Sequence, residues 1–325
     1  MQLGSNRFNG ATILITGGTG SFGTAFLKRC LEMNVQEVRI FSRDEKKQYD
    51  LMQRYEDKRI RCIIGDVRDE QSVKDAMFGA DYVFHAAAMK QVPSSEEYPL
   101  EAVKTNVIGS SNVLRAAADN GVYKIVMLST DKACYPTSAM GHTKALMEKE
   151  AMRFARNDTG YTNPSVVITR FGNLFASRGS VVPSFLEQIY MKERITITDP
   201  NMTRFVMTLN DAIDLVMYAF DTGKNGDLFV YKSKAATVED IGKAVMMYSK
   251  KKVDVKYIGA RPGEKMNETL LTEEEALHSE ESDKFYRVNS SIESPEAVQF
   301  SSEFAEMYTP LDMVDMIRRE FGGDE

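Results

Sequence analysis

Residues Ala11–Gly23 read A-T-I-L-I-T-G-G-T-G-S-F-G, an apolar run followed by a glycine-rich turn. The run predicts a buried strand, and the turn leads into a helical pattern over Phe22–Met33. Within the turn, glycine recurs at every third position: Gly17, Gly20 and Gly23. Such a turn lets the backbone approach a pyrophosphate, whose charge the free N–H groups of a helix N-terminus favour. A glycine pattern alone could serve only to reverse the chain, but its place between strand and helix predicts dinucleotide binding.

Length and composition limit the class of protein. A chain of 325 residues is long enough for one large α/β domain with a smaller lobe. The apolar runs are too short to cross a membrane, and Gln2–Asn9 has no apolar core, so we expect neither a membrane partner nor a signal peptide. The three cysteines form no C-x-x-C pair, which favours a reducing cytoplasm. A formal charge of −6 argues against a nucleic-acid partner, and the three histidines show no metal-ligand spacing, so we expect no metal site.

Alternating strand and helix patterns predict the fold. Apolar strands recur through the first half of the chain: Glu37–Phe41, Arg61–Ile64, Tyr82–His85, Ile125–Leu128 and Ser165–Arg170. Helical patterns separate them, which predicts an α/β fold with a doubly wound parallel sheet of the NAD(P)-binding Rossmann type. We expect this domain to occupy residues 1–172, with its sheet ending near Arg170. Residues 173–325 would form a smaller substrate-binding lobe, with the chain crossing between the two parts.

The ends of the early strands predict how a cofactor would be held. The second strand ends in Ser42–Arg43, and an arginine there suits the 2′-phosphate of NADP, whereas NAD-binding proteins often carry a carboxylate. The alternative is that Arg43 is a solvated residue at a helix start. Asp66–Val67 follow the third strand, where an adenine ring would lie, and the small residues Ala86–Ala88 follow the fourth.

Three polar residues near these strand ends have more than one interpretation. His85 is better explained as a packed residue at a strand end than as a catalyst. Lys90 stands at the expected ligand-binding edge and is a candidate contact for substrate or cofactor. Asn106 lies among apolar residues of a predicted helix, and we favour a structural bridge there over a direct role.

The stretch Leu128–Lys144 reads L-S-T-D-K-A-C-Y-P-T-S-A-M-G-H-T-K and places hydroxyl, carboxyl and amine groups at the end of a strand. That edge of the sheet is where open α/β folds bind their ligands. The candidate catalytic residues are Thr130, Asp131, Lys132 and Lys144. Asp131 and Lys132 could instead form only an ion pair. Lys144 lies one helical turn beyond Met140, so both side chains point the same way.

Beyond residue 172 the character of the sequence changes. Glycine- and proline-marked loops alternate with shorter strands at Ile195–Thr198 and Leu228–Tyr231. Arg204 and Arg261 stand in separate loops, the second within R-P-G-E-K, and two such arginines suit a diphosphate. Taken singly, either arginine is more often part of a surface ion pair. Thr272–Asp283 carries six acidic residues and is most simply a solvated segment.

Several motifs together resemble those of a known family. They are T-G-G-T-G-S-F-G (Thr16–Gly23), F-S-R-D-E (Phe41–Glu45), G-D-V-R-D (Gly65–Asp69), H-A-A-A-M-K-Q-V-P (His85–Pro93), K-T-N-V-I-G (Lys104–Gly109), S-T-D-K-A (Ser129–Ala133), S-R-G-S-V-V-P (Ser177–Pro183), T-D-P-N-M-T-R-F (Thr198–Phe205) and R-P-G-E-K (Arg261–Lys265). The sequence resembles an extended short-chain dehydrogenase/reductase of the nucleotide-sugar-modifying kind, specifically the UDP-N-acetylglucosamine 4,6-dehydratases of bacterial polysaccharide and glycan synthesis. S-T-D-K-A with S-R-G-S-V-V-P is a specific combination, because ordinary sugar epimerases of this fold do not carry it.

The resemblance implies a reaction and a role for each catalytic residue. In this family NADP stays bound: it takes hydride from carbon 4 of the sugar, the ketone acidifies carbon 5, water leaves carbon 6, and the hydride returns there. By resemblance Lys132 is the base and Asp131 the acid, while Thr130 holds the carbon 4 hydroxyl and Lys144 the nicotinamide ribose. A lysine with a lowered pKa and a carboxyl with a raised pKa would suit these roles. The configuration at carbon 5 stays open.

The motif positions and the resemblance together give the expected binding residues. Those for the cofactor are Gly17, Thr19, Gly20, Ser21, Phe22, Gly23, Ser42, Arg43, Asp66, Val67, Ala86, Ala87, Ala88, Lys90, Asn106, Ser129, Lys144, Phe171 and Asn173. Those for UDP-N-acetylglucosamine are Lys90, Met140, Asn173, Ser180, Val181, Thr198, Arg204, Arg261 and Glu264. The fold commonly pairs subunits through long helices, here Leu100–Asn120 and Gly141–Arg156, so we expect at least a homodimer.

Met140 departs from the pattern of most short-chain dehydrogenases, in which a tyrosine at this position carries the proton. Some members of the same dehydratase family also have methionine there. The group that takes the proton from the carbon 4 hydroxyl therefore stays open between Asp131 and Lys132, acting through Thr130 or a water. Two alternatives remain: a catalytically silent NADP-binding regulatory protein, which would explain the missing tyrosine, and a 4-epimerase, which generally depends on that tyrosine.

Overall fold

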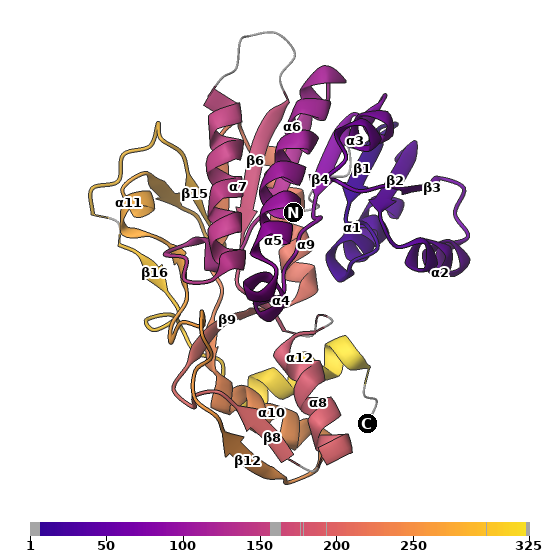
Figure 1. Cartoon of the computed structure of the whole chain (residues 1–325). Coiled ribbons are helices and arrows are strands. Elements are labelled where there is room, and N and C mark those ends of the chain that lie inside the picture. The colour runs from indigo at the N-terminus through magenta and orange to yellow at the C-terminus, as the bar shows by residue number, and fades with distance from the viewer. Residues whose placement is uncertain are drawn as a thin grey trace.

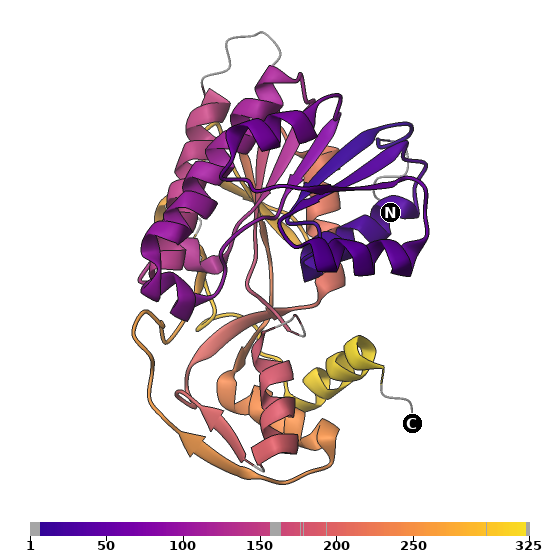
Figure 2. The ribbon, with the colours of Figure 1, turned by 45° about the vertical axis from the view of Figure 1, so that its right-hand side comes forward.

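The computed structural model of the chain describes residues 7–156, 164–175, 177, 179–192, 194–296 and 298–322. Most of Gln2–Asn9, and Arg178 of the S-R-G-S-V-V-P motif, lie outside those residues. The described chain has two parts, a large sheet with helices on both faces and a smaller lobe below it (Figure 1, Figure 2). This architecture confirms the predicted doubly wound α/β fold.

The large sheet has nine strands within the described residues, in the order β14-β15-β10-β6-β5-β4-β1-β2-β3. From β3 to β10 neighbouring strands are parallel, and β15 and β14 form an antiparallel edge. The strands are β1 (Thr12–Thr16), β2 (Glu37–Ser42), β3 (Ile60–Ile64), β4 (Tyr82–His85), β5 (Lys124–Leu128), β6 (Ser165–Arg170), β10 (Asp227–Tyr231), β14 (Ser279–Glu281) and β15 (Phe285–Val288). The chain leaves β3 at one edge and returns as β4 on the far side of β1, which creates the switch point where such folds bind ligands.

The prediction that the sheet ends near Arg170 is wrong. β10, which comes from beyond residue 172, pairs in parallel with β6 and places Leu228 beside Ile168. Both residues are buried. A short apolar strand has the same pattern whichever sheet it joins, so the sequence could not assign β10 to this one. The chain therefore crosses from the lobe back to the sheet at β10 and again at β14 and β15.

Helices cover both faces of the sheet because each presents an apolar stripe to it. On one face lie α1 (Ser21–Leu31) and α9 (Leu209–Thr222), where the Phe26 and Phe220 rings stack with centroids 5.7 Å apart. On the other face α3, α6 and α7 pack side by side (Figure 1). The bounds of the other helices here are α2 (Glu45–Tyr55), α3 (Glu70–Met77), α4 (Val92–Glu97), α5 (Pro99–Val103), a π-helical turn (Lys104–Ile108), α6 (Gly109–Asp119), the 3₁₀ turn η2 (Asp131–Ala133) and α7 (Ala139–Arg156).

The smaller lobe has its own apolar core, which includes Phe185, Ile195, Val245 and Ile317. Its elements are β7 (Asn173–Leu174), α8 (Val181–Lys192), β8 (Arg194–Ile197), β9 (Thr203–Met207), β11 (Ala235–Thr237), α10 (Val238–Ser249), β12 (Asp254–Tyr257) and α12 (Pro310–Phe321). Residues of β13 (Thr269–Leu271) and α11 (Glu273–Ala276) belong to the core of the large sheet, and β16 (Phe300–Ser301) pairs with β13. In the ranges described, no helix combines the length and apolar character needed to cross a bilayer. The same ranges contain no group of three or more His, Cys, Asp and Glu residues placed to hold a metal ion.

A buried arginine joins the sheet to α7 and α11. Arg170 at the end of β6 is 1% exposed, and its guanidinium donates to both carboxylate oxygens of Glu148, at 2.5 and 3.0 Å. It also donates to both oxygens of Glu275, at 2.7 and 2.8 Å, and to the carbonyl oxygen of Leu270. The acidic segment Thr272–Asp283 is therefore not simply solvated, because Glu275 belongs to a buried ion cluster.

We expect Arg170→Ala to lower the free energy of unfolding by about 3–5 kcal/mol, because the buried carboxylate of Glu148 and the half-buried one of Glu275 would lose their partner. Arg153→Ala is the matched control. Arg153 lies on α7, close in sequence to Glu148, and forms a more exposed ion pair with Glu150. Its loss should therefore change stability little. Urea denaturation of both variants measures the difference. Equal losses for the two variants would contradict the structural role of the cluster.

Candidate active site

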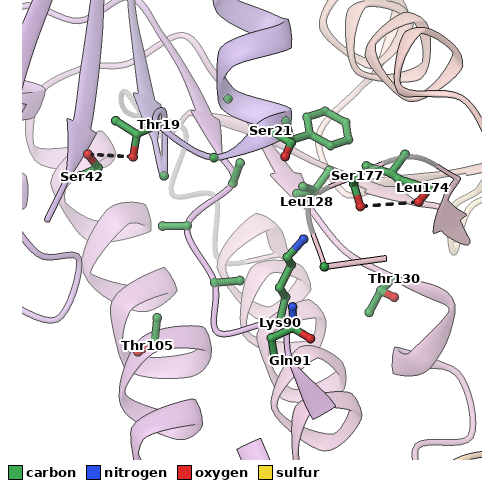
Figure 3. Close-up of a pocket in the computed structure, with 18 of the residues that line it drawn as sticks. Thr19, Ser21, Ser42, Lys90, Gln91, Thr105, Leu128, Thr130, Leu174 and Ser177 are labelled. Carbon is green, nitrogen blue, oxygen red and sulfur yellow. Dashed lines mark hydrogen bonds between the residues drawn. The ribbon is translucent and has the colours of Figure 1, made fainter. Parts of the chain in front are cut away.

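A cavity of about 880 Å³ opens at the carboxyl ends of β1, β2, β4, β5 and β6. In Figure 3, Thr19 and Ser42 mark one end and Thr130 another, and Lys90 extends between them. The predicted cofactor residues that line it are Gly17, Thr19, Gly20, Ser21, Phe22, Gly23, Ser42, Arg43, Asp66, Val67, Ala86, Ala87, Ala88, Lys90, Ser129, Lys144, Phe171 and Asn173. Asn106 is the one member of that set that does not.

The turn after β1 brings backbones close together. Gly17 has a φ of +67°, and a Cβ there would lie 2.8 Å from the Cα of Ala87. A Cβ on Gly23 would lie 2.5 Å from the Cα of Gly18. Helix α1 begins after Gly20, and no side chain of the described residues caps its first N–H groups. The turn therefore leaves room and free donors for an anion, which fits the pyrophosphate of a dinucleotide.

The end of β2 presents a hydroxyl and two cations to the cavity. The Ser42 hydroxyl accepts a hydrogen bond from Thr19 Oγ1 at 3.2 Å (Figure 3). The Arg43 side chain is 63% exposed, and its guanidinium lies 3.7 Å from the carboxylate of Asp66. Lys47, one turn further along on α2, also lines this end of the cavity. Two exposed cations at the end of β2 fit a 2′-phosphate.

His85 packs in the sheet, as its place at a strand end predicted. It is 1% exposed, with Nδ1 2.7 Å from Thr16 Oγ1 and Nε2 2.8 Å from Ser110 Oγ. Burial, with a smaller contribution from the charge of Lys144, lowers the pKa of His85 to about 3. The imidazole therefore stays neutral and joins β1 to α6.

Asn106 forms a structural bridge. Its side-chain oxygen accepts from the Met89 N–H at 2.8 Å, and its amide nitrogen donates to the Met89 carbonyl oxygen at 3.0 Å. The same nitrogen donates to Thr143 Oγ1 on α7 at 2.9 Å. The bridge fixes the segment after β4 against α7. Asn106 does not line the cavity itself, but it holds in place a segment that does.

Three of the four candidate catalytic residues stand together after β5. Asp131 is fully buried, and its Oδ1 accepts from Thr130 Oγ1 at 2.8 Å and from Lys132 Nζ at 3.0 Å. Its Oδ2 has no hydrogen-bond partner among the described residues. Thr130 and Lys132 line the cavity, whereas Asp131 does not. A proton therefore reaches Asp131 from the cavity most directly through these two neighbours.

Lys132 lies between two carboxylates. Its Nζ is 3.0 Å from Asp131 Oδ1 and 3.4 Å from Glu268 Oε1, and it donates to Asn173 Oδ1 at 3.2 Å. Burial disfavours the charge on Lys132, but Asp131 and Glu268 outweigh both burial and the charge of Arg204, so its pKa is raised. This direction is opposite to the lowered pKa expected for a base, and one cause is Glu268, which was not predicted for the site.

Lys144 and Met140 share one face of α7. The Lys144 amine donates to the Leu128 carbonyl oxygen at 2.6 Å, and burial lowers its pKa to about 8, against a smaller opposing effect of Glu148. Met140 is 4% exposed, and both residues line the cavity. This wall therefore offers an amine and a thioether, and no phenol stands beside Lys144 at position 140.

The predicted substrate residues divide into two groups. Lys90, Met140, Asn173 and Ser180 line the cavity, whereas Val181, Thr198, Arg204, Arg261 and Glu264 do not. Arg204 lies in β9 and not in a loop, is 9% exposed, and donates to the Thr203 carbonyl oxygen at 2.7 Å. Arg261 is exposed, and its N–H donates to Glu264 at 3.1 Å. The shared diphosphate role of the two arginines stays a prediction.

Several cavity residues were not predicted. They are Phe41, Asp44, Lys47, Gly65, Gln91, Thr105, Leu128, Gly172, Leu174, Ser177 and Gly179. The position of Lys47 could have been predicted, because it lies four residues after Arg43, and residues at that spacing near a helix start lie on the same side. Glu268 follows R-P-G-E-K by three residues but has no local feature that would distinguish it from a surface glutamate.

A family model described as polysaccharide biosynthesis protein matches residues 13–290. Similar curated proteins include the UDP-glucose 4-epimerases of Rickettsia massiliae and Rickettsia prowazekii. Each is 51% identical over 282 residues, which cover 85% of this chain and 82% of the relative.

Solved structures agree with the fold. The X-ray structure of Pen from Bacillus thuringiensis is 35% identical with a TM-score of 0.92, over 97% of this chain and 99% of that chain. DesIV, a dTDP-glucose 4,6-dehydratase from Streptomyces venezuelae solved with NAD and TYD bound, is 22% identical with a TM-score of 0.72, over 78% and 86%. The fold is thus that of the Rossmann-type short-chain dehydrogenase/reductases. Within that class, the chain belongs to the polysaccharide biosynthesis family.

We expect Arg43→Glu to shift cofactor preference from NADP toward NAD. Loss of a charge-assisted contact to the 2′-phosphate should weaken NADP binding by about 1.5–3 kcal/mol. Calorimetric titration of the protein freed of cofactor measures both affinities. Lys46→Glu makes a similar charge change on α2 at an exposed residue paired with Asp50 and should leave the preference unchanged. Equal affinity of the unmodified protein for NAD and NADP would refute the assignment.

Proposed function

We propose that this protein is an NADP-dependent UDP-N-acetylglucosamine 4,6-dehydratase that acts in bacterial surface polysaccharide or glycan synthesis. The observation that carries the proposal is the group Thr130–Asp131–Lys132 beside the glycine turn, with methionine at position 140. An elimination of water next to a ketone needs both an acid and a base, and this group contains one of each. Residues 1–172 would chiefly bind NADP and residues 173–325 the nucleotide sugar.

The cofactor residues have defined tasks in this proposal. NADP, when bound, supplies the acceptor and donor of hydride. The glycine turn and the N-terminus of α1 bind its pyrophosphate, and Arg43 with Lys47 contacts its 2′-phosphate. Lys144, held on the Leu128 carbonyl oxygen, orients the nicotinamide ribose.

The proton taken from the carbon 4 hydroxyl passes to Asp131 through Thr130. The Thr130 hydroxyl already donates to Asp131 Oδ1 at 2.8 Å, so it accepts the sugar proton as it gives up its own. Asp131 is then a carboxylic acid, and it returns this proton by the same route to the carbon 6 oxygen as the carbon–oxygen bond breaks. The departing group is water, and Asp131 ends as the carboxylate with which it began.

Lys132 handles the other proton. In its neutral form it takes the proton from carbon 5, which the adjacent ketone makes acidic, and becomes an ammonium. It gives a proton back to carbon 5 when hydride returns to carbon 6. Both residues therefore recover their starting states, with Asp131 ionised and Lys132 neutral.

The second candidate is a nucleotide-sugar 4-epimerase, favoured by the names of the Rickettsia relatives. Epimerisation needs oxidation at carbon 4 and return of the hydride to the other face. It uses no acid for carbon 6 and no base for carbon 5, so Asp131 and Lys132 would be left without those tasks. A catalytically silent NADP-binding regulatory protein is the third possibility, and it too would not need an acid–base pair.

One experiment separates these candidates. The purified protein is incubated in deuterated water with UDP-N-acetylglucosamine, and in parallel with UDP-glucose, and the products are analysed by NMR and mass spectrometry. A dehydratase gives a product lighter by one water with solvent deuterium at carbon 5, whose configuration is read directly. An epimerase gives an isomer of unchanged mass without solvent deuterium, and a silent protein gives no product.

We expect Lys132→Ala and Asp131→Asn each to lower turnover by about two to four orders of magnitude, the range for a positioned acid or base. Lys132→Ala should stop the reaction after oxidation of carbon 4. Reduced cofactor, measured by its absorbance, and a 4-keto sugar that keeps its carbon 6 oxygen should then accumulate. Lys149→Ala, at an exposed lysine of α7, is the control. Near-full activity of Lys132→Ala would refute the assignment of the base.

We also expect Met140→Tyr to gain little turnover or to lose some. Acid–base catalysis depends on placement within a hydrogen bond, and a site that moves protons through Thr130 has no task for a phenol. The tyrosine ring would also occupy part of the cavity in which the sugar is proposed to bind. Met140→Leu, which keeps an apolar side chain of similar volume, should retain activity. A rise in turnover of about tenfold or more for Met140→Tyr would show that the proton path through Thr130 is wrong.

A further inference from the structure

Glu268 is a buried carboxylate to which the proposed reaction gives no task. It is 2% exposed and lies just before β13. Its N–H donates to Ser302 Oγ at 2.8 Å, and its carbonyl oxygen accepts from the Ser302 N–H at 2.8 Å. The preceding residue, Asn267, accepts a hydrogen bond from Thr203 Oγ1 at 2.8 Å. Segments far apart in the chain therefore hold Glu268 in place.

The Glu268 carboxylate faces cations from three directions. Its Oε1 lies 3.4 Å from Lys132 Nζ and its Oε2 lies 2.8 Å from Lys265 Nζ, while Arg204 of β9 contributes a third positive charge. Burial raises the pKa of Glu268, but these charges outweigh burial and hold it below its usual value. Glu268 is therefore ionised, and its charge is shared between Lys265 and Lys132.

We infer that Glu268 is a positioning residue of the acid–base pair, which holds the Lys132 amine against Asp131 and stabilises the ammonium formed when Lys132 takes a proton. This inference rests on the proposed function, which gives that ammonium its place in the reaction. The charged groups that face Lys132 are Asp131 from η2, Glu268 and Arg204. Asn173 of β7 adds a neutral acceptor. Without Glu268, one carboxylate instead of two would balance the ammonium.

The position of Glu268 has a benefit and a cost for catalysis. A carboxylate beside the forming ammonium favours removal of the carbon 5 proton, because it makes Lys132 a stronger base. The same carboxylate keeps more of the resting Lys132 protonated at neutral pH. Since the neutral amine starts the reaction, kcat/KM should fall as pH falls below the pKa of Lys132, and Glu268 should set where this acid limb lies.

The first test does not need turnover. The protein is labelled with trace acetic anhydride across a pH series, and acetylation of Lys132 is measured by peptide mass spectrometry, because only a neutral amine reacts. In Glu268→Gln the midpoint for Lys132 should move down by about one pH unit or more, the effect of removing a nearby opposite charge. Glu268→Asp, which keeps the charge, should move it less. An unchanged midpoint in Glu268→Gln would refute the inference, even if the protein proved to be an active dehydratase.

The second test uses the pH dependence of kcat/KM with UDP-N-acetylglucosamine. The acid limb should shift to lower pH in Glu268→Gln by the same amount as the labelling midpoint. Glu275→Gln is the matched control: it neutralises a half-buried carboxylate that is paired with Arg170, so it should lower stability without moving the limb. A loss of activity with an unmoved limb would make Glu268 merely structural. A labelling shift in a protein that forms no dehydrated product would instead refute the proposed function and leave the contact with Lys132 established.

Discussion

The parallel order of the strands is the constraint on which the site depends. Because β1, β2, β4, β5 and β6 run the same way, their carboxyl ends meet at one edge, and residues distant in the chain share one cavity. The edge also depends on the missing side chain of Gly17, since a Cβ there would collide with Ala87 after β4. The glycine turn thus does more than leave space for an anion. It lets the segments after β1 and β4 approach each other, so that both line the cavity.

Burial disfavours the charge on both Lys132 and Lys144, two of the lysines that line the cavity, but the net pKa shifts differ in direction because their neighbours differ. Lys144 faces a backbone carbonyl oxygen, and the charge of Glu148 only partly offsets burial, so its pKa falls to about 8. Lys132 is balanced by Asp131 and Glu268, and its pKa rises. One amine is therefore partly neutral near physiological pH while the other is held charged. In the proposed reaction Lys144 is a polar anchor at the ribose, and Lys132 acts as the base at carbon 5 only in its neutral form.

The sequence predicted what local patterns determine. The glycine spacing, the strands and the polar group after β5 depend on neighbours within a few residues. The glycine turn and the polar residues Thr130 and Lys132 line one cavity, at the edge where the sequence predicted them. What it could not predict depends on long-range pairing. β10 pairs with β6 in the large sheet. Glu275, within the acidic segment, binds Arg170, and Glu268 lies beside Lys132 although the two are far apart in the sequence. None of these contacts has a period or spacing that a single sequence reveals.

The buried position of Asp131 favours the proposed proton path. A carboxylate that is fully buried exchanges protons with bulk water only through its neighbours, and the neighbours bonded to it are Thr130 and Lys132. In short-chain dehydrogenases with a tyrosine at position 140, the phenol would meet the sugar hydroxyl first. Here a hydroxyl that lines the cavity, that of Thr130, already donates to the Asp131 carboxylate. An acid formed by this route can return its proton through Thr130, and the other neighbour bonded to it, Lys132, also lines the cavity. Methionine at position 140 is compatible with this path, since Met140 lines the same cavity as Thr130 and the path needs no proton on its thioether.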